Sequence, residues 1–452
     1  MGEVRRELSP MERWYWVCDQ ISPLNVVARV RVRGVCTPVD LERAAAMLVG
    51  EHPLLRVAVA GQDGARPRFA GAANPRIPVR AVDAEPSDVD RWHREVGAVE
   101  LTSSLDWHTG PLARLADIAY GRGTAEECHD LVLTVSHIVA DGTTALGLLR
   151  RLVELAARPP LEPPPSRPAL PPPEAMLPRR VNRLPRAAHL VAAMLADSVA
   201  TAVARPRRFV PDTPVPPHRR RTGLVHRELT AAQLAELTAR CRREGVTVHS
   251  ALTAAMAIAV SGTVPARTRV TIGSPVDFRA ELDPPVAPDD AGAYVATVPS
   301  HVAVAGGGDL WDVARGAFRD LRRRTRFRQH LALVSLLRFM SPRSVATSAR
   351  AVAVVDRVGP GNVCLSNIGR YDFPARAGEW ELSGAQFIAG VSVSGYLVAT
   401  VNTSHGVLQW NFTYIDGAIT GARAEQIADR ALRALLSGLR RTGDAVRAGT
   451  RG

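Results

Sequence analysis

Residues 131–147 decide the fold, and they read Leu-Val-Leu-Thr-Val-Ser-His-Ile-Val-Ala-Asp-Gly-Thr-Thr-Ala-Leu-Gly. The first five form a short, largely apolar run without alternation, which is typical of a strand buried on both faces. From Thr143 to Ala156 the apolar residues recur at helical spacing, which predicts an amphipathic helix. A buried strand, a turn and a helix therefore follow one another, and the turn contains His137, Asp141 and Gly142.

These three residues are candidate site residues. His137 follows the end of the strand, so its side chain projects into whatever cleft opens there. An imidazole, with an ordinary pKa near ~6.5, can take a proton from an alcohol, amine or thiol and return it. Asp141 has three alternative roles: to orient the histidine, to pair with a distant arginine, or to cap the following helix. Gly142 supplies the backbone freedom that the turn needs. The alternative is that the three residues only shape the end of the strand and the start of the helix. The motif alone does not distinguish this structural role from a catalytic one.

Outward from this segment the chain divides into three blocks. Residues 1–157 form a first α/β block, with a strand over 26–32 and a helix over 39–50. Residues 158–222 are a Pro- and Arg-rich linker with one helix predicted over 187–203, which either packs on the body as a crossover or lies on a membrane or over a substrate entrance. Residues 223–452 form a second α/β block with strands at 224–229, 269–273, 397–403 and 408–414 and helices at 231–243, 248–260 and 424–439. Because both blocks repeat the same order of elements, we expect two similar lobes.

Composition limits the class of protein. The chain has 452 residues, of which 46% are hydrophobic and 22% charged, and this balance excludes a fibrous or wholly disordered protein. No apolar run reaches the ~20 residues of a membrane span, and the N-terminus lacks the layout of a signal peptide. We therefore expect a cytoplasmic protein without a transmembrane segment.

Cysteines and charge limit the partners. The five cysteines are scattered and form no CxxC pair, so neither a disulfide framework nor a metal site is expected. The formal net charge is +13, and every basic residue other than histidine is an arginine. Nucleic acid is disfavoured because no aromatic-studded basic ribbon or zinc-finger spacing is present. A phosphorylated small molecule or an acidic carrier protein fits better, and Arg322, Arg323 and Arg326 are candidate contacts unless they are only a solvated helix face.

Further segments extend the pattern along nearly the whole chain. Besides His137-x-x-x-Asp141-Gly142, they are Leu8–Glu12, His52–Arg56, Leu105-Asp106 with Gly110–Leu112 and Arg114, Val276–Arg279, Gly292–Pro299 and Leu365–Gly369. In content and order they resemble the superfamily of chloramphenicol acetyltransferase, nonribosomal peptide condensation domains, polyketide-associated acyltransferases and bacterial wax ester synthases, which share an HHxxxDG motif.

The resemblance implies an α/β fold of two similar chloramphenicol acetyltransferase-like lobes, with mixed sheets and an interfacial tunnel. It implies an acyltransferase that uses a thioester of coenzyme A or of a phosphopantetheinyl carrier protein as substrate, with no bound cofactor, and a small hydroxyl or amine acceptor. His137 would be the general base. Asp141 would be structural, in a bidentate pair with Arg279, and Gly142 would lend its N–H near the oxyanion. Candidate oxyanion contacts are Ser366 and Asn367, which equally suit a turn cap before Gly369.

Two departures from the family pattern bear on function. The first histidine of the motif is Ser136, which we expect to face away from the cleft because neighbouring strand residues point to opposite faces. Ala296 stands where condensation domains often carry Asn, which favours ester formation over peptide synthesis. The alternatives are a free-standing amide-forming condensation enzyme and a non-catalytic module that recruits a carrier protein. Arg279 also has a local alternative partner, Asp277.

Overall fold

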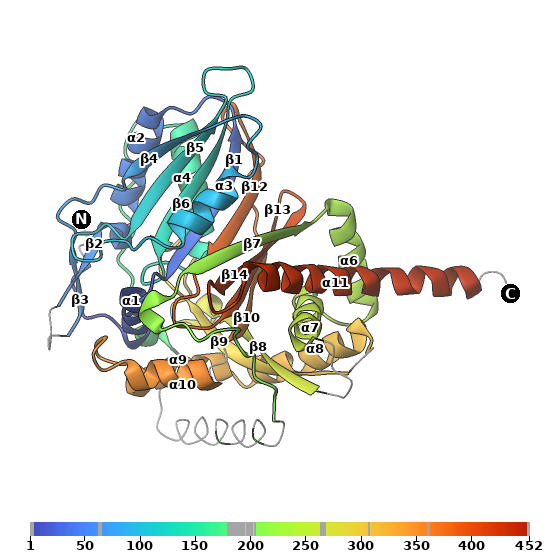
Figure 1. Cartoon of the computed structure of the whole chain (residues 1–452). Coiled ribbons are helices and arrows are strands. Elements are labelled where there is room, and N and C mark those ends of the chain that lie inside the picture. Colours follow the sequence, from blue (N-terminus) through green and yellow to red (C-terminus); the bar gives the residue numbers. More distant parts are fainter. Residues whose placement is uncertain are drawn as a thin grey trace.

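The computed structural model describes residues 4–61, 66–178, 195, 202, 205–262, 268–305, 308–358 and 362–449. Two lobes lie one above the other in Figure 1, and each is built on a six-stranded mixed sheet with helices against it. The helix predicted over 187–203 lies outside the described residues, apart from Leu195 and Ala202.

The first lobe contains the sheet of order β11-β12-β1-β6-β5-β4. Its strands are β1 (Asn25–Arg33), β4 (Val79–Ala84), β5 (Ala113–Tyr120), β6 (Cys128–Ser136), β11 (Arg376–Ala377) and β12 (Trp380–Ala389). Only the β4–β5 pair is parallel. Helices α2 (Pro38–Glu51) and α4 (Gly142–Ala157) pack on each other, and α4 covers β1, β6 and β12. A small sheet of β2 (Val57–Ala60) and β3 (Arg68–Gly71) lies beside them.

The second lobe contains the sheet of order β7-β14-β13-β10-β8-β9. The strands are β7 (Thr222–Leu229), β8 (Thr268–Asp277), β9 (Val295–Val304), β10 (Val363–Arg370), β13 (Leu397–Ser404) and β14 (Val407–Ile415). The helices are α6 (Ala231–Arg243), α7 (Val248–Ser261), α8 (Leu310–Arg326), α9 (Gln329–Met340), α10 (Ala349–Val358) and α11 (Gly421–Gly449). Helix α7 is buried along almost its whole length, between the sheet and helices α8 and α11.

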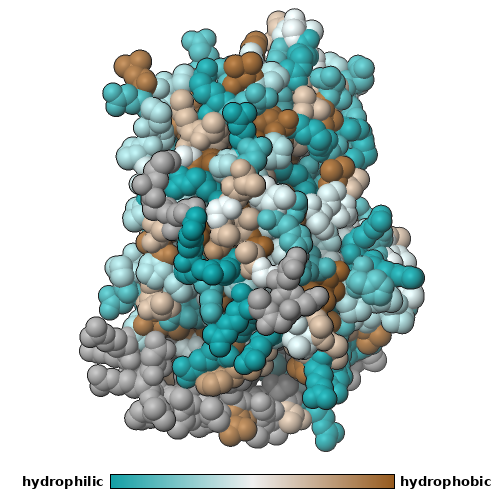
Figure 2. All heavy atoms as spheres, turned by 90° about the vertical axis from the view of Figure 1, so that its left-hand side faces the viewer, coloured by the Kyte–Doolittle hydropathy of each residue, from teal (hydrophilic) through white to brown (hydrophobic). Residues whose placement is uncertain are grey.

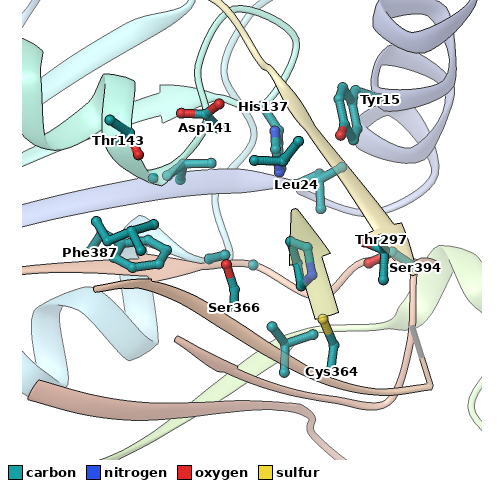
Figure 3. Close-up of a pocket in the computed structure, with 18 of the residues that line it drawn as sticks. Tyr15, Leu24, His137, Asp141, Thr143, Thr297, Cys364, Ser366, Phe387 and Ser394 are labelled. Atoms are coloured by element: carbon teal, nitrogen blue, oxygen red, sulfur yellow. The ribbon is translucent and has the colours of Figure 1, made fainter. Parts of the chain in front are cut away.

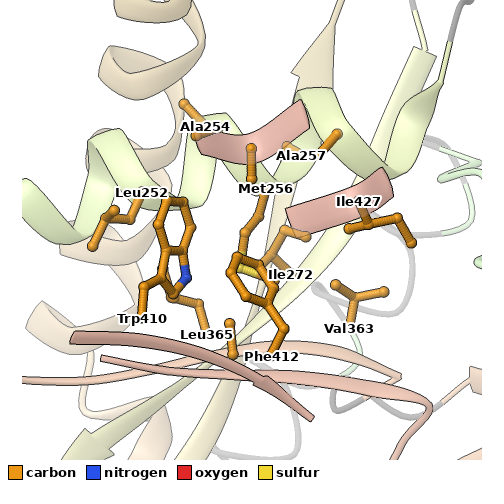
Figure 4. Packing of buried hydrophobic residues seen from close by; sticks show 14 of the residues in the cluster. Leu252, Ala254, Met256, Ala257, Ile272, Val363, Leu365, Trp410, Phe412 and Ile427 are labelled. Atoms are coloured by element: carbon orange, nitrogen blue, oxygen red, sulfur yellow. The ribbon is translucent and has the colours of Figure 1, made fainter. Parts of the chain in front are cut away.

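The core of the second lobe explains why α7 is so apolar. Leu252 and Met256 of α7 pack toward Trp410 and Phe412 of β14, and Ile272 of β8 lies among them (Figure 4). Trp410 and Phe412 are fully buried, and burying an aromatic side chain contributes roughly 1.5–3 kcal/mol or more. The strands and helices expected in this block are all present, several of them a few residues longer than predicted.

The structure differs from the expected division of the chain in one respect. Residues 376–389, from the second block, contain β11 and β12; β12 pairs with β1 of the first lobe, and β11 pairs with β12 at the edge of the sheet. Side chains of the second sheet then donate to carbonyl oxygens of β12: Asn402 to Ala385 at 2.9 Å and Thr400 to Phe387 at 3.0 Å. The two sheets are therefore joined along β12. The block that begins at residue 223 contributes strands to both sheets, so the expected boundary in the sequence is not a boundary between the lobes.

The N-terminal helix α1 (Pro10–Ile21) was not expected as an element. It begins at a capping box, in which Ser9 accepts from the N–H of Glu12 and Glu12 accepts from that of Ser9. Helix α9 packs against α1, and Arg13 of α1 donates to the carbonyl of Pro342 in the α9–α10 turn. The left-hand face of Figure 1 is largely hydrophilic, with apolar side chains scattered among polar ones (Figure 2).

Candidate active site

A cavity of about 240 Å³ lies between the lobes, with walls from both sheets. The first lobe supplies His137 and Val26, and the second supplies Thr297, Cys364 and Ser366 (Figure 3). Its further lining residues include Trp14, Tyr15, Leu24, Asp141, Gly142, Thr143, Pro275, Asp277, Val295, Asn367, Phe387 and Ser394. The structure places the expected catalytic residues at this interface, whereas a tunnel through the molecule stays a prediction.

His137 lies just beyond the end of β6, where its backbone N–H donates to the backbone carbonyl of Leu24 at 3.2 Å. Its ring is partly buried and stacks on that of Tyr15, with centroids 4.2 Å apart and planes 12° apart. Burial lowers the pKa of His137 below its ordinary value, although the charge of Asp141 and the backbone carbonyls of His137 and Ala140 oppose this. Nδ1 is buried without a well-formed hydrogen bond, so Nε2 is the nitrogen left to meet a substrate.

Asp141 is the N-cap of α4, and it is buried. Its Oδ1 accepts from the N–H of Thr144 at 3.0 Å and from Nη2 of Arg279 at 2.8 Å, and its Oδ2 accepts from the N–H of Tyr294 at 2.8 Å. Burial alone would raise the pKa of Asp141, but the charge and hydrogen bond of Arg279, with the two backbone donors, lower it below its ordinary value. The carboxylate is therefore ionised, and it joins the turn of the first lobe to the second lobe.

Arg279 combines the two partners that the sequence left as alternatives. One nitrogen, Nη2, reaches Asp141 and also donates to the hydroxyl of Thr144 at 2.8 Å, while Nη1 pairs with Asp277 at 3.1 Å. The expected bidentate pair with Asp141 is thus replaced by a single contact, because the guanidinium is shared between two carboxylates. Its face lies over the ring of Tyr294, 4.7 Å from the centroid. Among the described residues no hydrogen bond joins Asp141 to the imidazole, so Asp141 shapes the turn rather than orienting His137.

Gly142 owes its identity to a close approach. A Cβ at this position would lie 2.5 Å from two ring carbons of Phe387, which is on β12. Gly142 is the first residue of α4, where backbone N–H groups have no partner within the helix. The missing side chain therefore lets the start of α4 pack directly against Phe387 of β12.

Both candidate oxyanion contacts, Ser366 and Asn367, line the cavity. Oδ1 of Asn367 accepts from the N–H of Gly369 at 2.8 Å, so this side chain forms the turn cap that was the alternative expectation. Ser366 presents its side chain to the cavity in Figure 3. Its hydroxyl remains the better candidate of the two.

The two departures lie away from the cavity. Ser136 is fully buried and is not part of the lining, and its hydroxyl accepts only a long contact from the N–H of Ile138 at 3.4 Å. Ala296 belongs to the buried cluster around Phe278 and Tyr294, while its neighbours Val295 and Thr297 face the cavity. Ala296 therefore contributes to packing and not to the cavity, so its identity does not favour ester formation over amide formation.

Arg322, Arg323 and Arg326 lie exposed on the last turns of α8, outside the cavity lining. Arg323 pairs with Asp320 at 2.8 Å. Arg220, in a second basic cluster at 219–221, is different: it is buried and makes two hydrogen bonds, of 2.9 and 2.8 Å, to Asp356. Arg220 is therefore a structural residue.

Sequence reasoning missed the contribution of α1, which brings Trp14 and Tyr15 to the cavity. The signal was available, since Ser9-Pro10-Met11-Glu12 is a helix-start pattern. Among the described residues, no group of three or more His, Cys, Asp or Glu side chains could hold a metal ion. Within the same residues no single helix is long and apolar enough to cross a membrane; only α6 and α7 together pass that test, and they meet at a bend of 100°.

Comparison with solved structures decides the fold. The epimerization domain of the third module of tyrocidine synthetase B superposes with a TM-score of 0.69 at 16% identity, covering 97% of this chain and 98% of that one. The trichothecene 15-O-acetyltransferase TRI3 of Fusarium sporotrichioides gives 0.71 at 13% identity, covering 96% and 95%. The chain has the condensation-domain fold. Both the α/β class and the chloramphenicol acetyltransferase-like pair of lobes are thereby confirmed.

Other relatives agree with this condensation-domain fold. Polyketide synthase associated protein 5 of Mycobacterium tuberculosis gives a TM-score of 0.64 at 18% identity, covering 96% of this chain and 99% of that one. Residues 219–377 match the family model of the phthiocerol/phthiodiolone dimycocerosyl transferase C-terminus. A linear gramicidin synthase of Brevibacillus parabrevis is 30% identical over 154 residues, which is 32% of this chain but only 2% of that protein.

Proposed function

We propose that this protein is an acyltransferase that moves an acyl group from a thioester of coenzyme A or of a carrier protein to a hydroxyl acceptor. The observation that carries the proposal is the placement of His137: a partly buried imidazole of lowered pKa, in a cavity between two lobes that Asp141 and Arg279 join. The name of one structural relative, an O-acetyltransferase, supports acyl transfer to oxygen, and the name of the matching family model, a dimycocerosyl transferase, supports acyl transfer in general. We further propose that the reaction belongs to secondary-metabolite or lipid biosynthesis.

The proposed mechanism is direct transfer. Nε2 of His137 accepts the proton of the acceptor hydroxyl as its oxygen attacks the thioester carbonyl carbon. Negative charge moves to the carbonyl oxygen, where the N–H of Gly142 and the hydroxyl of Ser366 are the proposed donors. The tetrahedral intermediate then expels the thiolate, which takes the proton from His137. Acyl group, proton and charge balance without an acyl-enzyme or a bound cofactor.

A second candidate is amide formation by the same base, with an amine as acceptor. It is supported by the similarity of 154 residues to a linear gramicidin synthase. The third candidate, a non-catalytic module that binds a carrier protein, has less support, because Ser136 lies outside the cavity while His137, Asp141 and Gly142 are intact.

The deciding experiment is turnover with a panel of acyl thioesters and hydroxyl or amine acceptors, read by mass spectrometry of the products. His137→Ala should lower kcat by about 10²–10⁴, the usual contribution of a positioned base, with an unchanged thermal transition. Because burial lowers the pKa of His137, the acidic limb of kcat/KM should lie below pH ~6.5. Ser136→Ala is the matched control and should change turnover little. Wild-type turnover by folded His137→Ala would remove this residue from the mechanism.

A further inference from the structure

Tyr15 of α1 lies against the proposed base. The two rings stack face to face at 4.2 Å and lie side by side at the upper end of the cavity in Figure 3. Tyr15 lines the same cavity as His137, and no hydrogen bond among the described residues involves its hydroxyl. That oxygen is also not among the buried unpartnered atoms, and it lies at the cavity end of the ring in Figure 3.

Tyr15 is held in place from several directions. Its side chain packs against three buried hydrophobic clusters: the first-lobe core, the cluster around Phe278, and the cluster around Cys18. Such a junction allows the ring little freedom, because protein interiors are close-packed. Imidazole rings, in contrast, rotate about χ2 in a broad well unless something restrains them. The stacked phenol supplies that restraint for His137.

Helix α1 is itself anchored at its N-terminus. Arg6 makes two hydrogen bonds of 2.7 Å to Glu12 of the capping box. Glu174, from the linker, accepts from the N–H of Met11 at 2.8 Å. These contacts fix the position of α1, and therefore the position of Tyr15 against the imidazole of His137.

We propose that Tyr15 positions His137 for the reaction: its ring fixes the plane of the imidazole and shields one imidazole face from water, while its hydroxyl binds a polar atom of the acceptor. This inference rests on the proposed function. The phenol acts as a neutral donor, because burial raises the pKa of Tyr15 above its ordinary value. It is not a second base.

Other titratable groups around this site are accounted for. The cavity lining also contains Asp141, Asp277 and Cys364, and Cys18 and Glu174, which lie outside the lining, act electrostatically on Tyr15. Burial raises the pKa of Cys364 to about 12 and raises those of Cys18 and Glu174, while Asp141 stays ionised. Burial also raises the pKa of Asp19, at the end of α1, to about 6, and Asp19 accepts from the N–H of Leu24 at 2.7 Å. Its titration overlaps the range expected for His137, so Asp19→Asn and Glu174→Gln are the controls that separate these carboxyls from His137.

The stacking is tested without turnover, by NMR titration of the histidine side chains, with the signal assigned by its loss in His137→Gln. Tyr15→Phe should leave the pKa of His137 unchanged, because the ring remains. Tyr15→Leu should raise it toward the ordinary value near ~6.5, since water then reaches the imidazole. Tyr15→Met serves the same purpose if the Leu variant does not fold. An unchanged His137 pKa in the folded Leu or Met variant would overturn the shielding.

Kinetics then test the two contacts separately. Tyr15→Phe should raise the KM of the acceptor about three- to tenfold, with kcat within twofold, as expected for the loss of one hydrogen bond. Tyr15→Leu should lower kcat about tenfold and move the acidic limb to higher pH. Trp16→Leu is the matched control, because Trp16 is buried on the same helix and outside the cavity lining, so it should lower thermal stability only. An unchanged acceptor KM in Tyr15→Phe overturns the hydroxyl contact, whereas absence of acyl transfer in the wild type overturns the proposed function alone.

Discussion

At the scale of single residues, Asp141 and Arg279 act as one unit. Both are buried, and each is the other's main charge partner within the interface between the lobes. Asp141→Asn or Arg279→Gln should each lower the free energy of unfolding by about 3–5 kcal/mol, because the remaining charge is left buried. The double variant should lose about 1–3 kcal/mol less than the sum, as measured by denaturant unfolding.

A matched control for this cycle is the exposed pair Arg43–Asp40, at 2.6 Å on α2. Its coupling should be no more than about 1 kcal/mol, because exposed ion pairs are screened by water. The lowered pKa of Asp141 adds a pH signature: its stabilising contribution is present above the ordinary pKa near ~3.9 and is lost as pH falls below it. Strict additivity of the Asp141 and Arg279 variants would contradict their pairing.

At the scale of elements, the start of α4 meets β12 at Gly142. Gly142→Ala should lower both thermal stability and kcat, because the added Cβ would lie 2.5 Å from the Phe387 ring and something must shift. We expect a loss of about 1–3 kcal/mol, measured by unfolding. The added variant Phe387→Leu should restore part of it, since a smaller side chain gives way.

Gly147→Ala is the control on the same helix. Its Cβ would have its nearest neighbour, the Tyr371 hydroxyl, at 3.5 Å, an ordinary contact. Alanine is a better helix former than glycine by roughly 1 kcal/mol, so this variant should be neutral or stabilised. Equal effects at positions 142 and 147 would show that the packing against β12 does not matter.

At the scale of the whole molecule, the charge of +13 bears on the acyl donor. If the exposed end of α8 contacts a donor phosphate or an acidic carrier, Arg322→Gln with Arg326→Gln should raise the donor KM about two- to fivefold without lowering kcat. Added salt should have the same effect, since the Debye length is only ~8 Å at physiological ionic strength. Arg433→Gln with Arg440→Gln, on exposed positions of α11, is the control. If neither added salt nor either double variant changes the donor KM, the arginines of α8 only face solvent and do not bind the donor. If salt raises the KM of a carrier-bound donor but not that of a free coenzyme A thioester, the natural donor is a carrier protein.

Much of the molecule follows from local sequence. The helix after the buried strand and most elements of the second block occur where their periodicity predicts them, and the strand at 131–135 occurs where an unbroken apolar run predicts it. Both signals are properties of contiguous segments. The turn with His137, Asp141 and Gly142 was located for the same reason. The repeated order of elements predicted the two lobes, and the family resemblance added the pairing of Asp141 with Arg279.

Tertiary structure alone decided the rest, because the deciding contacts join residues far apart in the chain. No local pattern says that β12 leaves the second block to pair with β1, or that Asp141 accepts from the N–H of Tyr294. Likewise, the stacking of Tyr15 on His137 requires α1 to be packed against the strand end, and Gly142 is explained only by the ring of Phe387. The sequence by itself determined which residues could do chemistry; the packing of two lobes determined which of them share a cavity.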